Sequence, residues 1–132
     1  MSKQSFVTGL LPYKAGIDLT PYLGRAVRLV DGGIQFAGSG QKPFGVVVVG
    51  APEGETATIA VNGSGAIVPV KLTAPAEAGD TLVCAEDGMM PFTTPDEWHL
   101  AYKCAIALED IAFNGIGLAV LITPTQVIDP LA

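Results

Sequence analysis

Short apolar segments alternate with turn residues at nearly even spacing through the middle of the chain. Residues 44–72 hold three runs rich in Val, Ile and Thr, separated by turns at residues 50–55 and 62–65. β-Branched side chains suit a pleated sheet, whereas Gly, Pro, Asn and Asp favour turns. Strands repeated every 8–12 residues or so are typical of small β-barrels and β-sandwiches. The pattern therefore predicts an all-β fold, a small antiparallel β-barrel or β-sandwich.

The same pattern predicts further strands on both sides of this stretch. Apolar or β-branched residues gather between turn residues in the segments 25–30, 34–36, 81–85, 89–92, 103–108 and 116–122. Residues 101–108 could instead extend a helix from Trp98, because their apolar positions also fit one helical face. We favour the strand, since residues 116–122 need an antiparallel partner.

Two segments carry helix signals. Asp18 and Gly24 are typical of the cap and the stop of one helical turn, and Pro21 disfavours a longer helix. Residues 93–100 begin with Thr and Pro and place acidic side chains in the next turn. We therefore expect one short helical turn in the β-fold.

The two ends of the chain lack a clear period. Residues 1–16 mix apolar side chains with Gly, Pro and Ser, which indicates an extended N-terminal arm. Residues 17–123 are the predicted β-domain, and residues 124–132 are a C-terminal tail. Ordering a free arm costs backbone entropy, so we expect it to be mobile or only loosely attached until a partner adds strand pairing. We recognise no internal repeat in the sequence.

Composition indicates one domain with a covered surface. The chain has 132 residues, of which 49% are hydrophobic and 15% charged, against about 25% charged residues in an average globular protein. A surface poor in charge is often buried by a partner. We therefore expect an oligomer or an assembly component.

The charge and the hydrophobicity of the sequence argue against nucleic acid and membrane as direct partners. The net charge is −6 and the seven basic residues are scattered, whereas nucleic-acid binding needs clustered positive charge. No apolar run approaches the roughly 20 residues of a membrane helix, and the N-terminus lacks the pattern of a signal peptide. We expect no direct contact with nucleic acid or membrane, and synthesis in the cytoplasm.

No residue set points to catalysis. His99 is the only histidine, so a nucleophilic pair of Cys84 or Cys104 with His99 is formally possible but has no local support. We favour reduced core thiols for both cysteines over a disulfide between neighbouring strands. Gly-Ser-Gly triplets at residues 38–40 and 63–65 lack the context of a phosphate loop. We predict no enzyme activity, catalytic residue, metal site or cofactor.

Apolar side chains outside the periodic strands are the candidate contacts with a partner. Aromatic residues are enriched at protein interfaces, and the arm and the segment around Trp98 both contain them. The candidate interface residues, toward another protein or another protomer, are Phe6, Val7, Leu10, Leu11, Tyr13 and Trp98.

The order of these turns and strands resembles the small decoration, or cement, proteins that coat the capsids of tailed bacteriophages. The resemblance runs from about Asp18 to about Ile122. It is carried by Asp18-Leu19, Ala26-Val27, Gly45-Val46, the turn 52–55, the strand 57–61, Gly63, Val68-Pro69-Val70, the turn 78–80, Asp87-Gly88, the segment 106–109 and the strand 120–122.

This resemblance implies a structural virion protein. It implies binding to the major capsid protein on the outside of the shell, reinforcement of that shell and assembly as a homotrimer, with no catalytic residue to transfer. The insert at residues 93–100 departs from the family pattern, which has a short connection there.

A second hypothesis comes from another class, a carrier or ligand-binding β-domain of the biotinyl or lipoyl kind. Such domains present a modified lysine at a hairpin tip. The turn at residues 78–80 is compatible with one, but Lys71 lies beside a strand, and the turns 62–65 and 86–88 contain no lysine.

Overall fold

The computed structural model describes residues 9–31, 33–38, 40–92 and 100–128, and these residues contain β-strands and no helix. The predicted all-β class is confirmed. The strands are β1 (Leu10–Lys14), β2 (Ala26–Val30), β3 (Gly33–Phe36), β4 (Gly45–Val49), β5 (Thr56–Val61), β6 (Ile67–Lys71), β7 (Thr81–Ala85), β8 (Gly88–Pro91), β9 (Leu100–Ala107) and β10 (Ile116–Ile128).

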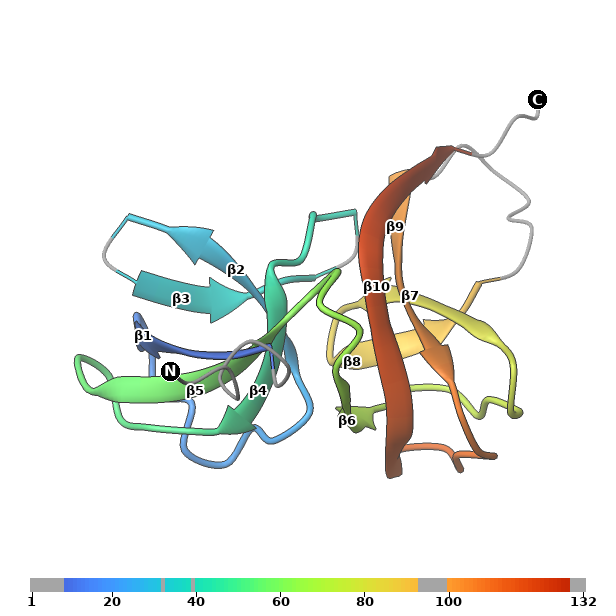
Figure 1. Cartoon of the computed structure of the whole chain (residues 1–132), viewed down its shortest axis with the longest axis horizontal. Helices are drawn as coiled ribbons and strands as arrows, with labels where there is room; N and C mark the ends of the chain where they lie inside the picture. Colours follow the sequence, from blue (N-terminus) through green and yellow to red (C-terminus); the bar gives the residue numbers. More distant parts are fainter. Residues whose placement is uncertain (1–8, 32, 39, 93–99, 129–132) are drawn as a thin grey trace, which may run out of the picture.

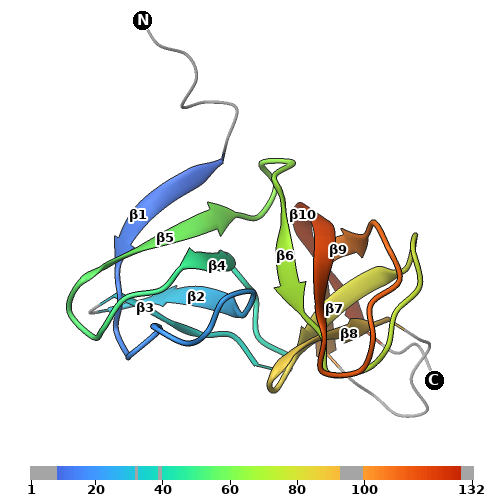
Figure 2. The ribbon, with the colours of Figure 1, turned by 90° about the horizontal axis from the view of Figure 1, so that it is seen from below.

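The strands form two five-stranded sheets that lie side by side (Figure 1). The first sheet has the order β1-β5-β4-β2-β3, and the second has the order β6-β10-β9-β7-β8. Neighbouring strands pair antiparallel in both sheets. In Figure 2, β6 lies between the strands of the first sheet and β10, so the two sheets meet along it. We call residues 9–63 the first half and residues 64–128 the second half.

The second half repeats the fold of the first. Its strands follow the same spatial order, with β6 in the place of β1 and β7 to β10 in the places of β2 to β5. The registers also correspond: Lys14 pairs with Thr56 in the first half, and Lys71 pairs with Ile116 in the second. The interpretation that the chain has no internal repeat is therefore wrong. The molecule contains the same five-stranded fold twice in tandem.

Each sheet curls until its first and last strands meet, which makes a small, nearly closed barrel. A parallel bridge joins Ala15 to Ile34 in the first half, and an equivalent bridge joins Leu72 to Met89 in the second. Closure of this kind protects strand edges from unwanted pairing. The predicted barrel is present, but as two copies.

A glycine makes room for each closure. Gly33 and Gly88 have φ angles of 129° and 156°, which side chains with a Cβ rarely adopt. A Cβ at Gly33 would collide with the backbone oxygen of Lys14, and one at Gly88 would lie 2.6 Å from that of Lys71. The same residue type thus solves the same steric problem in both halves.

Each barrel has its own apolar interior. The first is filled by side chains that include Leu19, Val27, Ile34, Val47 and Ile59. The second is filled by side chains that include Leu72, Leu82, Met89, Ala107 and Leu121. Side chains on the outer face of the first sheet, Ala26, Val46 and Ala60, join the second cluster. The second half therefore covers one outer face of the first.

Part of the predicted arm belongs to the first barrel. Residues Leu10–Lys14 form β1 and pair with β5 along their whole length, and Ala15 is fully buried. The expectation that residues 10–16 are mobile is wrong, because β5 supplies the strand pairing that we had assigned to a partner. Phe6 and Val7 lie outside the described residues.

The predicted tail also begins inside a strand. β10 continues to Ile128 and pairs with β9 on both sides of an irregularity between Leu121 and Thr125. This irregularity takes in Pro124, which has no N–H to donate to a ladder. Proline therefore marks a break in register here, where we had expected the end of the domain.

The predicted helical turn at residues 18–24 is wrong. Tyr22 N donates to Leu19 O at 3.1 Å, and Arg25 N donates to Tyr22 O at 3.2 Å, so two tight turns follow one another. Asp18 does accept from Thr20 N at 3.0 Å, as a capping residue would. The helix signal at residues 93–99 lies outside the described residues, whereas the strand predicted at residues 103–108 is confirmed by β9.

Candidate interaction surfaces

The cysteines are buried and free. Cys84 and Cys104 have their sulfur atoms 4.0 Å apart, about twice the length of a disulfide bond. The hydrogen bond with Cys84 and burial raise the pKa of Cys104 well above its usual value. A thiol in this state is protonated at neutral pH and is a poor nucleophile. His99 lies outside the described residues.

Metal and membrane signals are also lacking in the part of the chain that the structure describes. There, no group of three or more His, Cys, Asp and Glu side chains could hold a metal ion. Among the same residues, no helix has the length and apolar character needed to cross a membrane.

The lysine position does not fit a swinging-arm carrier. Lys71 lies within the paired end of β6, and its N–H donates to the backbone oxygen of Gly24 at 3.0 Å. The tips of the β2–β3 and β7–β8 hairpins instead carry the acidic residues Asp31, Glu86 and Asp87. No hairpin of these two pairs presents a lysine for modification.

The structure brings three of the six predicted interface residues together on β1. Leu10 and Leu11 are exposed. Tyr13 is half-buried and packs edge to face on Phe44, with ring centroids 5.1 Å apart, so it mainly stabilises its own barrel. Phe6, Val7 and Trp98 lie outside the described residues.

Asn62 ties the two halves together. It follows β5, and its side-chain nitrogen donates to Cys104 O at 2.8 Å and to Ile122 O at 3.1 Å. Cys104 lies where the pairing of β7 with β9 shifts by one residue, between Leu82 and Val83, so its backbone oxygen is available to another partner. From the sequence we had assigned Asn62 to a turn, because a turn residue and a bridging residue look alike there.

Arg25 makes a second tie between the halves. It is 9% exposed, and its guanidinium donates to the backbone oxygen of Glu86 at 3.0 Å. The same group lies 4.1 Å from the centroid of the Phe36 ring, within the range of a cation–π contact. The first half thus holds the β7–β8 hairpin of the second by a buried cation.

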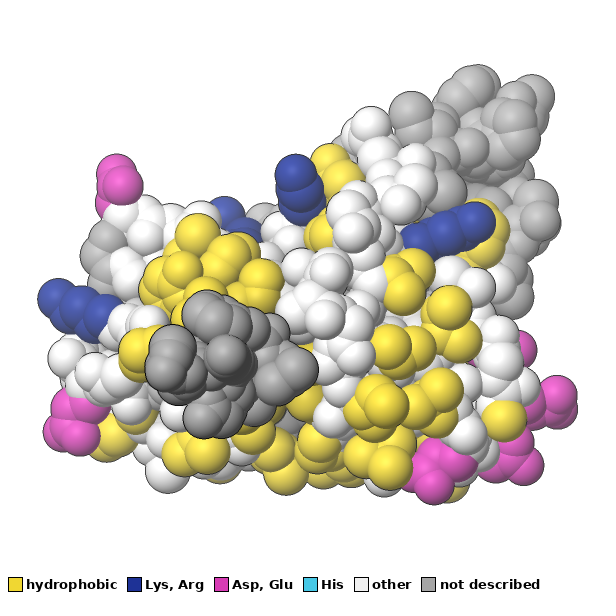
Figure 3. Space-filling view, viewed as in Figure 1, with side chains coloured by type: hydrophobic (Ala, Val, Ile, Leu, Met, Phe, Trp, Pro, Cys, Tyr) yellow, Lys and Arg dark blue, Asp and Glu magenta, His cyan; other side chains and the backbone are white. Residues whose placement is uncertain are grey.

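A broad apolar face covers the outer side of β6, β10 and β9. Its most exposed members are Ile67, Leu108, Ile116 and Leu118. Figure 3 shows hydrophobic side chains gathered over the second half, with acidic side chains beside them at the lower right. We call Ile67, Ile106, Leu108, Ile116, Leu118 and Val120 the β10 face. A continuous apolar run at residues 116–122 was its signal in the sequence, since a strand with one wet face should alternate.

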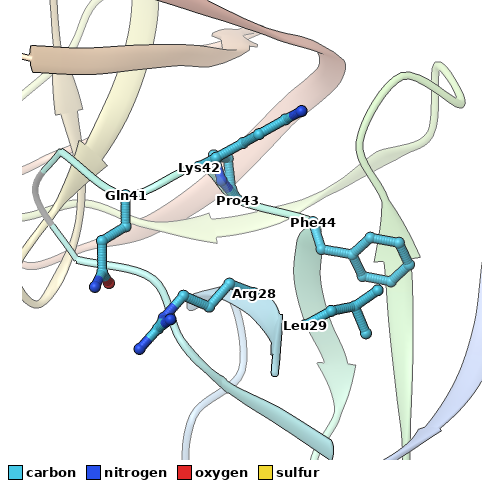
Figure 4. A pocket seen from close by; sticks show the side chains of 6 residues that line it. All are labelled: Arg28, Leu29, Gln41, Lys42, Pro43 and Phe44. Carbon is cyan, nitrogen blue, oxygen red and sulfur yellow. The ribbon is translucent and has the colours of Figure 1, made fainter. Parts of the chain in front are cut away.

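The first half carries an open hollow of about 450 Å³ on another side. It is lined by Arg28, Leu29, Gln41, Lys42, Pro43 and Phe44. Figure 4 shows Leu29 beside the Phe44 ring at one end, and Arg28 directed toward Gln41 at the other. Leu29 is 50% exposed, so an apolar floor with a basic rim faces solvent here. We call these six residues the β2 hollow.

Comparisons with known proteins identify the fold. No protein-family model matches this chain, and no curated protein matches it either. Among solved structures, it is similar to the crystal structure of the N base of head fiber gp8.5 of bacteriophage phi29. That likeness has a TM-score of 0.59 at 17% sequence identity and covers 89% of this chain and 96% of that chain. The two chains share a fold over nearly their whole lengths.

Proposed function

We propose that this chain is a structural virion protein of a tailed bacteriophage that binds the outer surface of the capsid and stabilises the shell. Its partner would be the major capsid protein, and it would act as a homotrimer. The observation that carries the proposal is the shared fold with the base of a phage head fiber over 89% of this chain.

Two independent features support it. The sequence resembles capsid decoration proteins from about Asp18 to about Ile122, which is a separate line of argument from the shared fold. The second feature is the β10 face, on which Ile67, Leu108, Ile116 and Leu118 are exposed, whereas soluble monomers rarely expose broad apolar patches.

The proposal assigns no catalysis, cofactor or nucleic-acid contact to the chain. Both cysteine thiols are buried, and the described residues show no cluster for a metal. A protein that reinforces a shell needs only a rigid body and a complementary surface. Two nearly closed barrels joined by hydrogen bonds and a shared apolar cluster provide such a body.

Adsorption to phage heads tests the proposal. Expanded heads prepared without this protein should bind the purified chain, and bound chain should sediment with them up to a fixed number of copies per head. Decorated heads should also release their DNA at a higher temperature than bare heads. Wild-type heads, whose sites are already filled, are the matched control and should bind little more.

Absence of binding to bare expanded heads would overturn the proposal. Binding without saturation would also count against it, because a defined lattice offers a defined number of sites. Intact mass of the native protein checks the other class, since a covalent biotin or lipoyl adduct would favour a carrier domain.

A further inference from the structure

We propose that the β10 face is the surface through which one copy of this chain docks onto the β2 hollow of a second copy. This inference deepens the proposed function, because it assigns the contact that would build the oligomer. It starts from the tandem repeat, which gives each position in one half a counterpart in the other.

The registers define these counterparts without ambiguity. Val46 pairs with Ala60 in the first half, as Ile106 pairs with Val120 in the second. Pro12 pairs with Thr58, as Pro69 pairs with Leu118. The β10 face is therefore the counterpart of the outer face of β1, β5 and β4.

That outer face is covered in the first half. Val46 and Ala60 are 0% exposed, and both pack into the apolar cluster of the second half. Their counterparts Ile106 and Val120 are only half-buried. The first half thus has a neighbour on this face, and in the second half the equivalent face lacks one among the described residues.

The accessible side chains of the two faces differ in polarity. The accessible positions on β5 are occupied by Thr56 and Thr58, whereas their counterparts on β10 are Ile116 and Leu118. Ile116 is 50% exposed and Leu118 44% exposed. Exposed threonine suits a surface that stays in water, and exposed leucine and isoleucine suit one that is covered.

The repeat also indicates what covers it. The second half contacts the first through β6, through the β7–β8 hairpin and through the backbone at Cys104. The counterparts of these elements in the first half are β1, the β2–β3 hairpin and Phe44. The β2–β3 hairpin and Phe44 border the β2 hollow. Within one chain, the second half covers the outer face of the first half. The first half of a second copy can cover the β10 face in the same orientation.

Charge favours the same pairing. Glu109 and Asp110 are exposed beside Leu108 at the rim of the β10 face, while Arg28 and Lys42 line the β2 hollow. The apolar floor of the hollow, with Leu29 half exposed, meets the apolar centre of the face. The two surfaces are different, so the contact is heterologous and repeats around a ring if the rotation closes.

Two matched substitutions test the face. The wild-type chain should show, by native mass spectrometry and sedimentation, a species that is a multiple of the 13.6 kDa chain. Leu118→Glu should weaken assembly more than about tenfold, the effect of losing one central apolar anchor. Thr58→Glu, at the counterpart position of the first half, should assemble like wild type. Ile67→Glu repeats the test on β6, and circular dichroism checks that each variant is folded.

A mixing experiment tests the partner surface. Leu29→Glu should also give single chains, because it places a charge in the β2 hollow. Mixed with Leu118→Glu, it should give a heterodimer that cannot close into a ring, since one intact face then meets one intact hollow. Normal assembly of folded Leu29→Glu or folded Leu118→Glu, or a wild-type chain that stays single at all concentrations, would overturn the inference.

The head-binding assay separates this inference from the proposed function. A wild-type chain that is single in solution yet saturates bare heads would retain the capsid role without this interface. A chain that assembles through the β10 face but ignores heads would keep the interface and lose the capsid role.

Discussion

At the scale of single residues, the contact between the halves depends on a few polar side chains in an apolar setting. Asn62 and Arg25 both reach across the boundary and donate to backbone oxygens. Removing the donor of a buried acceptor destabilises the fold by more than one hydrogen bond stabilises it, because the acceptor has lost its contacts with water on folding and has no other partner. These residues therefore decide how firmly the two barrels are joined.

We predict that Asn62→Ala lowers the free energy of unfolding by about 1–3 kcal/mol, because it leaves the oxygens of Cys104 and Ile122 without that donor. Urea denaturation measures the change. Ser64→Ala, two residues away in the exposed turn, is the control and should cost less than about 1 kcal/mol. Equal effects of the two substitutions would show that the bridge contributes nothing.

Because of the Cys104 thiol, we predict that the folded protein becomes less stable at alkaline pH. Its pKa is raised in the folded state, whereas in the unfolded chain it should be near the ordinary value of about 8.5. The contribution of Cys104 to the free energy of unfolding is complete below the pKa of the thiol in the unfolded chain. It falls as the pH rises from there toward the pKa of the folded state, because only the unfolded chain releases the proton in this range. Melting temperatures between neutral pH and pH 10 or so should fall less in Cys104→Ala than in wild type. Parallel curves would contradict this assignment.

At the scale of elements, strands at both ends complete the barrels. β1 supplies one edge of the first sheet, and its end closes that sheet through Ala15. β10 spans the second sheet and continues past the irregularity before Thr125. Removing an end of the chain therefore has different effects depending on whether the cut falls outside or inside a strand.

We predict that deleting residues 1–8 leaves the fold intact, whereas deleting residues 1–16 unfolds the first barrel. The longer deletion removes β1 and exposes β5 and the interior around Ile59. Circular dichroism melts of the two truncations measure this, and the shorter one is the control for the longer. Equal melting of both proteins would show that β1 is dispensable.

At the scale of the whole molecule, the two barrels are joined by a continuous apolar cluster and by hydrogen bonds. The second apolar cluster includes Val46 and Ala60 from the first half. The backbone hydrogen bond from Lys71 N to Gly24 O also joins the two halves. A shared cluster couples the unfolding of the parts that contribute to it.

Coupled halves should unfold together. We predict a single calorimetric transition whose measured enthalpy equals the van't Hoff enthalpy. Asn62→Ala, which removes two of the cross-boundary bonds, is the variant in which the transition should broaden first. Two resolved transitions in the wild type would show that the barrels are independent.

The sequence by itself determined the strands and the class of the fold. Alternating β-branched residues and turn glycines carry that information locally, so β4 to β8 lie where residues 44–92 indicated. It also indicated buried, reduced cysteines, because isolated cysteines in apolar strands suit packing. The all-β fold that the pattern indicated is also the fold of the phage head fiber base to which this chain is similar.

Only the tertiary structure decided the duplication and the surfaces that depend on it. The halves share Pro12 with Pro69 and Lys14 with Lys71, but few other identities, because a barrel needs apolar volume and register rather than particular residues. Asn62 as a bridge and the β10 face as a surface both depend on which side of a strand another strand covers. That is set by contacts between residues far apart in the chain, and a local pattern of polar and apolar positions does not contain it.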